Sequence, residues 1–215
     1  MNIEVNEMSL DINGSKILDN VSCEITSNEF TCLVGPNGSG KSTLVKSILG
    51  EIKDFKGTIS NVNIRDVCYL PQIIQDPPFL SVNETCKLGF YNNDCVEEQE
   101  STLIKLLEIC GIPSISNSTF TDISVGEKQR AWLVFALAQS KDFIIMDEPL
   151  SSVDIQSRED FYSLLRDIAN MNKTLLVITH DIDMAVKYSD KLIVLDKGQV
   201  SFVGPTSKFN NKINS

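Results

Sequence analysis

The glycine-rich segment GPNGSGKS, from Gly35 to Ser42, constrains what this chain can fold into more than any other part of the sequence. It follows an uncharged, mostly apolar run, Phe30 to Val34, and it precedes TLVKSIL, a stretch suited to a helix. The glycines let the backbone curl so that successive N–H groups point inward, and the start of a helix adds partial positive charge. The segment therefore predicts a strand, a phosphate-binding loop and a helix in succession. The alternative is a plain turn between strand and helix.

Three further apolar runs predict strands that, like Phe30 to Val34, are buried on both faces; they are Phe143 to Met146, Leu175 to Ile178 and Leu192 to Leu195. Val67 to Leu70 is also predicted to be a strand. Continuous apolar runs of this length suit a parallel sheet covered on both sides, and the segments between them can form helices. This alternation predicts an α/β fold that binds ligands at the carboxyl ends of its strands.

Two regions depart from this alternation, and both are predicted to belong to one domain, residues 1–215. Near the N-terminus, short apolar segments are broken by Asn13-Gly14 and Ser27-Asn28, which predicts antiparallel hairpins at one edge of the sheet. Residues from about 73 to 124 are predicted to form an inserted helical subdomain, leaving 1–72 and 125–215 for the core and β subdomain. One helical face supports the insertion, and its residues are Leu103, Leu106, Leu107 and Cys110, ahead of Gly111 and Pro113.

A pair of acids stands at the end of one predicted strand. In FIIMDEP, Phe143 to Pro149, four apolar residues are followed by Asp147 and Glu148. Charges at the end of a core strand are costly unless they bind something. Asp147 is suited to hold Mg²⁺, and Glu148 is suited to orient or deprotonate a water that attacks a phosphate. The alternative is a pair of solvated acids.

The phosphate loop and the acidic strand indicate the broad class of P-loop NTPases, and a third motif is more specific. ISVGEKQR, Ile123 to Arg130, resembles the signature motif of ABC-type ATPases and stands shortly before the acidic strand, as in that family. Gln72 resembles the Q-loop glutamine, the segment 151–154 resembles the D-loop, and His180 resembles the switch histidine. The motifs occur in family order over essentially the whole chain, which resembles an importer-like ATP-binding subunit of an ABC transporter. The resemblance implies a RecA-like P-loop NTPase core.

The resemblance implies roles for the matching residues, with ATP and Mg²⁺ as cofactors. The implied catalytic residues are Glu148, His180, Gln72 and Lys41, and the implied metal ligands are Ser42, Gln72 and Asp147. The residues implied to bind the nucleotide are Gly35, Pro36, Asn37, Gly38, Ser39, Gly40, Lys41, Ser42, Thr43, Ile12, Ser124, Gly126 and Asp154.

The sequence departs from the family pattern at three positions. Val125 stands where the signature usually has a glycine, and because valine avoids left-handed dihedrals, the turn is predicted to be right-handed. Glu127 stands where glutamine is usual. Ile12 stands where many relatives place an aromatic residue against adenine, so apolar contact is expected to replace stacking and to weaken nucleotide affinity.

The resemblance also implies protein partners. In the family, the signature motif of one subunit closes over the ATP of another, which implies a second copy of this chain or a homologous ATPase. An integral membrane permease subunit is expected to dock between Gln72 and about Gly89, on exposed apolar anchors near Phe79, Leu80 and Val82.

Composition is consistent with this interpretation. The formal net charge of −10 argues against a surface for nucleic acid, which needs basic patches. No run reaches the roughly 18 uncharged apolar residues that span a bilayer, and the first residues do not resemble a secretory signal. The chain is therefore expected in the cytoplasm, peripheral on the inner face of the cell membrane. The cysteines, at positions 23, 32, 68, 86, 95 and 110, are expected to be buried and reduced.

Three functional hypotheses follow. The favoured one is ATP hydrolysis coupled to transport, with the segment that begins at His180 similar to importers of metal ions, siderophores or cobalamin. The second is a soluble ABC ATPase of iron–sulfur assembly, repair or translation, since Glu127-Lys128 is similar to some of those. The third, a regulatory module without hydrolysis, is disfavoured because Lys41, Ser42, Asp147, Glu148 and His180 are all present.

Overall fold

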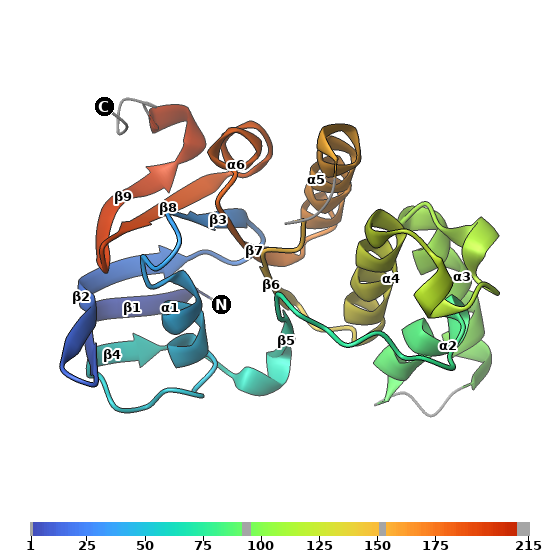
Figure 1. The fold of residues 1–215 in the computed structure, drawn as a ribbon, viewed down its shortest axis with the longest axis horizontal. Helices are drawn as coiled ribbons and strands as arrows, with labels where there is room; N and C mark the ends of the chain where they lie inside the picture. The colour runs from blue at the N-terminus through green and yellow to red at the C-terminus, as the bar shows by residue number, and fades with distance from the viewer. Residues whose placement is uncertain (1, 92–95, 151–153, 210–215) are drawn as a thin grey trace.

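Two β-sheets share one apolar core, and a group of helices lies beside them (Figure 1). The computed structural model describes residues 2–91, 96–150 and 154–209. Within these residues the larger sheet has six strands and the smaller one has three. The larger sheet positions the candidate site, because the predicted motifs follow its strands.

The six-stranded sheet has the order β5-β6-β7-β3-β8-β9. Every residue of three of its strands is buried, and all neighbours except the last pair run parallel. The five predicted apolar strands and the α/β class are thereby confirmed. The last strand pairs antiparallel with its neighbour and was not predicted. The strands are β3 Phe30–Val34, β5 Val67–Leu70, β6 Phe143–Asp147, β7 Thr174–Thr179, β8 Lys191–Asp196 and β9 Gln199–Pro205.

The N-terminal strands form a separate antiparallel sheet, with the order β2-β1-β4. Its strands are β1 Ile3–Ile12, β2 Ser15–Ile25 and β4 Lys56–Ser60. Asn13 and Gly14 have φ angles of 51° and 79° at the turn between β1 and β2, which confirms the predicted hairpin there. The prediction that the hairpins extend one edge of the main sheet was wrong. At Ser27-Asn28 the chain crosses to β3 in the other sheet, because the inward residues of β1 and β2 pack over a sheet face instead.

Helices cover both faces of the larger sheet. On one face, α1 Lys41–Ile48 packs in an apolar core shared with the smaller sheet. On the other face lie α5 Ile155–Asn170 and α6 Ile182–Tyr188. An aromatic stack joins these helices to β3, since the Tyr162 ring centroid lies 6.4 Å from that of Phe30 and 5.9 Å from that of Tyr188. The strands between these two cores therefore have no exposed face.

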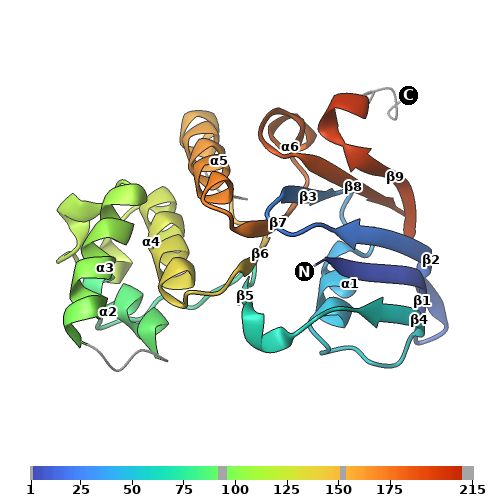
Figure 2. The same ribbon diagram turned by 180° about the vertical axis from the view of Figure 1, so that it is seen from behind.

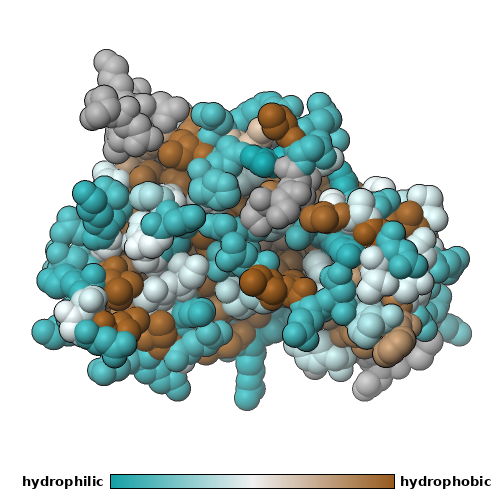
Figure 3. All heavy atoms as spheres, in the orientation of Figure 1, coloured by the Kyte–Doolittle hydropathy of each residue, from teal (hydrophilic) through white to brown (hydrophobic). Residues whose placement is uncertain are grey.

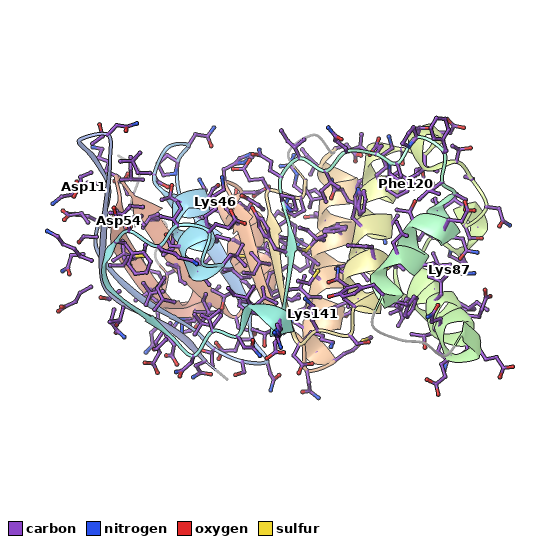
Figure 4. All side chains as sticks on the ribbon, turned by 90° about the horizontal axis from the view of Figure 1, so that it is seen from below. Asp11, Lys46, Asp54, Lys87, Phe120 and Lys141 are labelled. Carbon is purple, nitrogen blue, oxygen red and sulfur yellow. The ribbon has the colours of Figure 1, made fainter. Side chains whose placement is uncertain are left out.

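Three helices form a helical unit that lies to one side of the sheets in both views (Figures 1 and 2). They are α2 Val82–Lys87, α3 Val96–Ile109 and α4 Val125–Ala138, and α4 contacts both of the others. Leu103, Leu107 and Cys110 are buried and Leu106 is half-buried, which confirms the predicted helical face. Phe120, labelled in Figure 4, is fully buried in this unit. Its ring centroid lies 5.1 Å from that of Trp132. Short 3-10 turns occur at Ile64–Asp66, Leu88–Phe90, Pro113–Ile115, Phe120–Asp122 and Thr206–Lys208.

The three expected docking anchors differ in exposure. Phe79 is 91% exposed, as expected, and Leu80 is half-buried. The expectation for Val82 was wrong, because Val82 opens α2 and is fully buried in the core shared with α4. Elsewhere on the surface seen in Figure 3, hydrophobic side chains lie scattered between hydrophilic ones.

Five cysteines are buried and unpaired, which confirms the expectation for them; they are Cys23, Cys32, Cys68, Cys86 and Cys110. Cys95 lies outside the described residues.

Close packing at Gly89 yields a test of the helical unit. A Cβ atom at this position would lie 2.4 Å from the Phe135 carbonyl oxygen and 2.7 Å from Ala138 Cβ, so Gly89→Ala forces α4 to shift. We expect it to lower the free energy of unfolding by about 1–3 kcal/mol, measured by urea denaturation. Leu88→Ala is the control, because Leu88 is 56% exposed and its truncation is expected to cost within about 0.5 kcal/mol. Equal unfolding midpoints for the two variants would contradict the packing described here.

Candidate nucleotide site

The phosphate loop has space only for glycine at two of its positions. A Cβ atom at Gly35 would lie 2.0 Å from the Leu195 carbonyl oxygen, and one at Gly40 would lie 2.7 Å from Leu18 Cδ2. Gly40 also has a φ of 103° and stands at the N-cap of α1, where it offers no side chain to cap the helix. No acid lies in the first turn of α1. Its first N–H groups and its positive dipole end are therefore suited to bind an anion.

Lys41 carries its charge back over the loop. Its Nζ donates hydrogen bonds to the carbonyl oxygens of Gly35 at 2.8 Å and Pro36 at 3.0 Å. Burial lowers the pKa of the Lys41 ammonium, and the charges of Glu148 and Asp147 oppose that shift. Among the described residues, the buried Ser39 hydroxyl has no hydrogen-bond partner. A phosphate group would supply an acceptor for the Ser39 hydroxyl and a third acceptor for the Lys41 ammonium, which has three N–H groups.

An open hollow of about 430 Å³ adjoins the loop. The hollow is lined by residues of the loop, by the start of α1, and by Gln72 and Glu148, which are distant from the loop in sequence. Ile12, predicted to contact the base, is not among the lining residues and is 40% exposed. The apolar residue that lines the hollow is Ile17, on the same hairpin, which the sequence analysis missed. The sequence could have pointed to Ile17, because it is an apolar residue shortly after the Asn13-Gly14 turn.

Asp147 is the buried carboxylate at the end of β6. Burial raises its pKa, and a hydrogen bond from the Ser42 hydroxyl opposes that shift. The structure thus brings together two of the predicted metal ligands. The Tyr69 hydroxyl, on β5, donates to Asp147 Oδ2 at 3.4 Å, and burial raises the Tyr69 pKa to about 12. Tyr69 was not predicted to belong to the site. A hydroxyl and a carboxylate are oxygen donors of the kind that Mg²⁺ prefers.

Glu148 lies where three predicted catalytic side chains meet. Its Oε2 accepts a hydrogen bond from Gln72 Nε2 at 3.0 Å and lies 3.7 Å from His180 Nδ1. Its φ of 45° is rare for a residue other than glycine, and its N–H donates to the Ile178 carbonyl oxygen at 2.9 Å. Because β5, β6 and β7 are neighbours in the sheet, the residues that follow them converge at one edge.

The predicted signature motif forms the start of α4. Ser124 is its N-cap in a capping box: the Glu127 N–H donates to Ser124 Oγ at 3.3 Å, and Ser124 N–H donates to Glu127 Oε2 at 2.8 Å. A hydrogen bond from the Ser124 hydroxyl to Glu127 Oε2 at 2.7 Å lowers the Glu127 pKa, and the bond from the Ser124 N–H lowers it further, which explains why an acid fits this position. Val125 is the first residue of α4 and does not have a positive φ, which confirms the predicted right-handed turn. Gly126 faces open space.

Three of the predicted nucleotide-binding residues stand apart from the hollow beside Lys41. Neither Ser124 nor Gly126 lines it, and neither does Asp154. Asp154 is instead the N-cap of α5, where its carboxylate accepts the Ser157 N–H at 3.0 Å. The predicted D-loop residues 151–153 lie outside the described residues.

The fold and the site define a P-loop ATPase, and comparison with known proteins gives its family. The sequence profile of the family described as ABC transporter matches residues 18–151. The chain belongs to this family. It is 32% identical over 212 residues to a probable metal transport system ATP-binding protein of Thermotoga maritima, covering 97% of this chain and 86% of that one. It is 37% identical over 183 residues to the zinc import ATP-binding protein ZnuC 1 of Aliivibrio fischeri, covering 83% and 69%.

Solved structures agree on the fold. A nucleotide-free ATP-binding cassette from an ABC transporter aligns with a TM-score of 0.83 at 24% identity, covering 95% of this chain and 92% of that one. The ADP conformation of the cassette MJ1267 aligns with a TM-score of 0.84 at 25% identity, covering 95% and 91%. CbiO1 of Clostridium perfringens, part of the complex cbiONQ, aligns with a TM-score of 0.84 at 23% identity, covering 95% and 88%. The chain is an ATP-hydrolysing subunit of an ABC transporter.

Proposed function

We propose that this chain hydrolyses Mg-ATP at the hollow beside Lys41 and thereby drives import of a metal ion through a separate membrane subunit. The observation that carries the site is the convergence of Gln72, Glu148 and His180 beside the phosphate loop. The choice of cargo rests on the relatives, since a metal transport protein and a zinc import protein align over most of the chain. Siderophore and cobalamin import are less favoured, because the names of both relatives refer to the transport of a metal or of zinc.

The proposed roles follow from position and charge. Lys41 and the first N–H groups of α1 bind the β- and γ-phosphates, and Ser42, Asp147 and Gln72 hold Mg²⁺, which neutralises phosphate charge when bound. Glu148 orients and deprotonates the attacking water, since it lines the hollow beside Lys41. His180, 3.7 Å from Glu148, donates to the γ-phosphate and keeps that water in line.

A second ATPase subunit is part of the proposal. Ser124, Gly126 and Asp154 do not line the hollow that holds Lys41, yet the family resemblance assigns them to the nucleotide. A second copy of this chain, or a homologous subunit, would place these residues against ATP from the opposite side. Ser124 is exposed at the start of α4 and Gly126 has open space around it, so both are accessible to such a partner.

The membrane partner is proposed from surface features. We propose that a separate chain forms the pore; within the ranges that the structure describes, no helix is long and apolar enough to cross a bilayer. Ile73 and Phe79 are 82% and 91% exposed and follow Gln72 closely, which makes them candidate anchors for a helix of that chain. The proposed location of the chain is therefore the cytoplasm, peripheral on the inner face of the cell membrane.

A soluble ABC ATPase of iron–sulfur assembly, repair or translation is the alternative. Its support was the pair Glu127-Lys128, and the structure accounts for both residues locally. Glu127 completes the capping box, and Lys128 pairs with Asp76 at 2.7 Å. Affinity purification from native membranes distinguishes the two hypotheses, because recovery of a soluble scaffold in place of an integral protein would favour the alternative.

Two substitutions separate binding from hydrolysis. Lys41→Ala is expected to lower ATP affinity at least about tenfold, because it removes ground-state charge from the phosphates. Glu148→Gln is expected to keep ATP affinity within about threefold and to reduce turnover at least about a hundredfold, because only the action on water is lost. Calorimetric titration gives the affinities and phosphate release gives the turnover. Equal loss of affinity in both variants would contradict the assigned roles.

A substitution at Phe79 tests the docking surface. Phe79→Asp is expected to leave ATP hydrolysis by the purified chain within about twofold and to abolish zinc uptake by cells, because a charge in an apolar groove prevents docking. Ile64→Asp is the control, since Ile64 is 53% exposed and precedes β5 at the end opposite Gln72. Uptake that survives Phe79→Asp, or is lost equally in the control, would place the docking surface elsewhere.

A further inference from the structure

An ion pair joins α5 to the residue next to His180. Arg158 Nη1 donates to Asp181 Oδ2 at 2.9 Å, and the two side chains are only 26% and 17% exposed. Water screens a pair at this depth less than it screens an exposed pair. Removal of the pair is therefore expected to change the positions of the groups around it. Arg158 and Asp181 line the same small hollow as Glu148 and His180. The pair therefore adjoins the hydrolytic groups without contacting the phosphate loop.

Asp181 fixes the backbone on both sides of His180. Its Oδ1 accepts the Met184 N–H at 3.1 Å, which caps α6, and its own N–H donates to Thr179 Oγ1 at 3.0 Å. Thr179 is the buried last residue of β7. These two bonds hold Asp181 to β7 and to α6, and the Arg158 guanidinium holds its carboxylate from α5.

Arg158 also connects this segment to the start of α5. Its N–H donates to the Asp154 carbonyl oxygen at 3.0 Å, so it stands one turn after the N-cap. A displacement of Asp154 would move the first turn of α5 and with it the guanidinium. The contacts thus run from Asp154 through Arg158 and Asp181 to His180, which lies 3.7 Å from Glu148.

We propose that Arg158 is a positioning residue, which acts through Asp181 to hold His180 beside Glu148 during ATP hydrolysis. This rests on the proposed roles of His180 and Glu148. Arg158 would then govern the rate of the chemical step and leave the binding of ATP by Lys41 and the loop unaffected. The competing explanation is that the pair only joins two helices and contributes to stability.

The same helix contains a matched control. Arg166, two turns further along α5, pairs with Asp190 at 2.8 Å, and its side chain is also 26% exposed. Asp190, like Asp181, additionally accepts a backbone N–H, from Phe30 at 2.9 Å. This second pair adjoins the opposite end of the sheet, since Asp190 precedes β8. If arginine–aspartate pairs on α5 serve only stability, both should behave alike.

The experiment compares Arg158→Gln with Arg166→Gln in the full chain. We expect Arg158→Gln to lower kcat about tenfold with KM for ATP within about twofold, and Arg166→Gln to leave both within about twofold. Arg158→Lys should recover part of kcat because it keeps the charge. His180 is the only histidine in the sequence, so in an untagged protein its imidazole NMR signal needs no assignment. That signal is expected to move in Arg158→Gln and to stay in place in Arg166→Gln.

Each other result decides against the proposal. Equal kcat values for Arg158→Gln and Arg166→Gln would overturn it. A lowered kcat in Arg158→Gln with an unchanged His180 NMR signal would overturn it as well. If Arg158→Gln does not fold, Asp181→Asn takes its place, since asparagine can still cap α6 but cannot form the ion pair. Asp181→Asn with wild-type kcat would also overturn the proposal. If instead Glu148→Gln hydrolyses ATP at the wild-type rate, the proposed roles of the site residues are refuted. Failure of the proposed function can thus be told apart from failure of the Arg158 proposal.

Discussion

Burial of the central strands on both faces puts the polar groups of the candidate site at the ends of those strands. In β6, four apolar residues are enclosed between two cores before Asp147 and Glu148 appear. In β7, the buried run ends at Thr179 and His180 follows. In β3, it ends at Val34 and the phosphate loop follows. Because these parallel strands are neighbours, their ends supply one continuous edge of loop, acids, amide and imidazole.

At this edge, burial disfavours the charged forms of two side chains, and a bound nucleotide and metal would stabilise those forms. Burial raises the pKa of Asp147 and lowers that of Lys41, so it disfavours the charged form of each. The two groups partly compensate each other, and Ser42 donates to Asp147. A bound cation beside Asp147 and a bound phosphate beside Lys41 would stabilise both charged forms. Glu148 adds a backbone φ of 45°, a local strain at the residue assigned to the water.

The smaller sheet contributes to the site as well as to the core. It encloses α1 against the larger sheet, and the Ile17 carbonyl oxygen approaches the position of a Cβ at Gly40 to 3.0 Å. The same hairpin brings the Ile17 side chain to the hollow. The conformation of the phosphate loop thus depends on contacts with β2, although the loop and its helix belong to the other sheet.

Local sequence patterns predicted the parts of this protein that local forces determine. The buried strands, the phosphate loop and the acids after β6 follow from apolar runs, glycines and strand ends. The pattern failed where partners distant in sequence decide. The edge strands β4 and β9 lack a continuous apolar run, and Val82 is buried in a core that residues distant in sequence complete, among them those of α4. The Arg158–Asp181 pair joins residues 23 positions apart that carry no motif of their own.

The most direct test of the central claim, that one edge of the larger sheet holds Mg-ATP, is a crystal structure of Glu148→Gln with Mg²⁺ and ATP. The account predicts the β- and γ-phosphates on the first turn of α1 against Lys41, with the metal between Ser42 and Asp147. It also predicts Ser124 of a second ATPase subunit against the γ-phosphate. Phosphates bound away from α1, or a metal that does not reach Asp147, would contradict it.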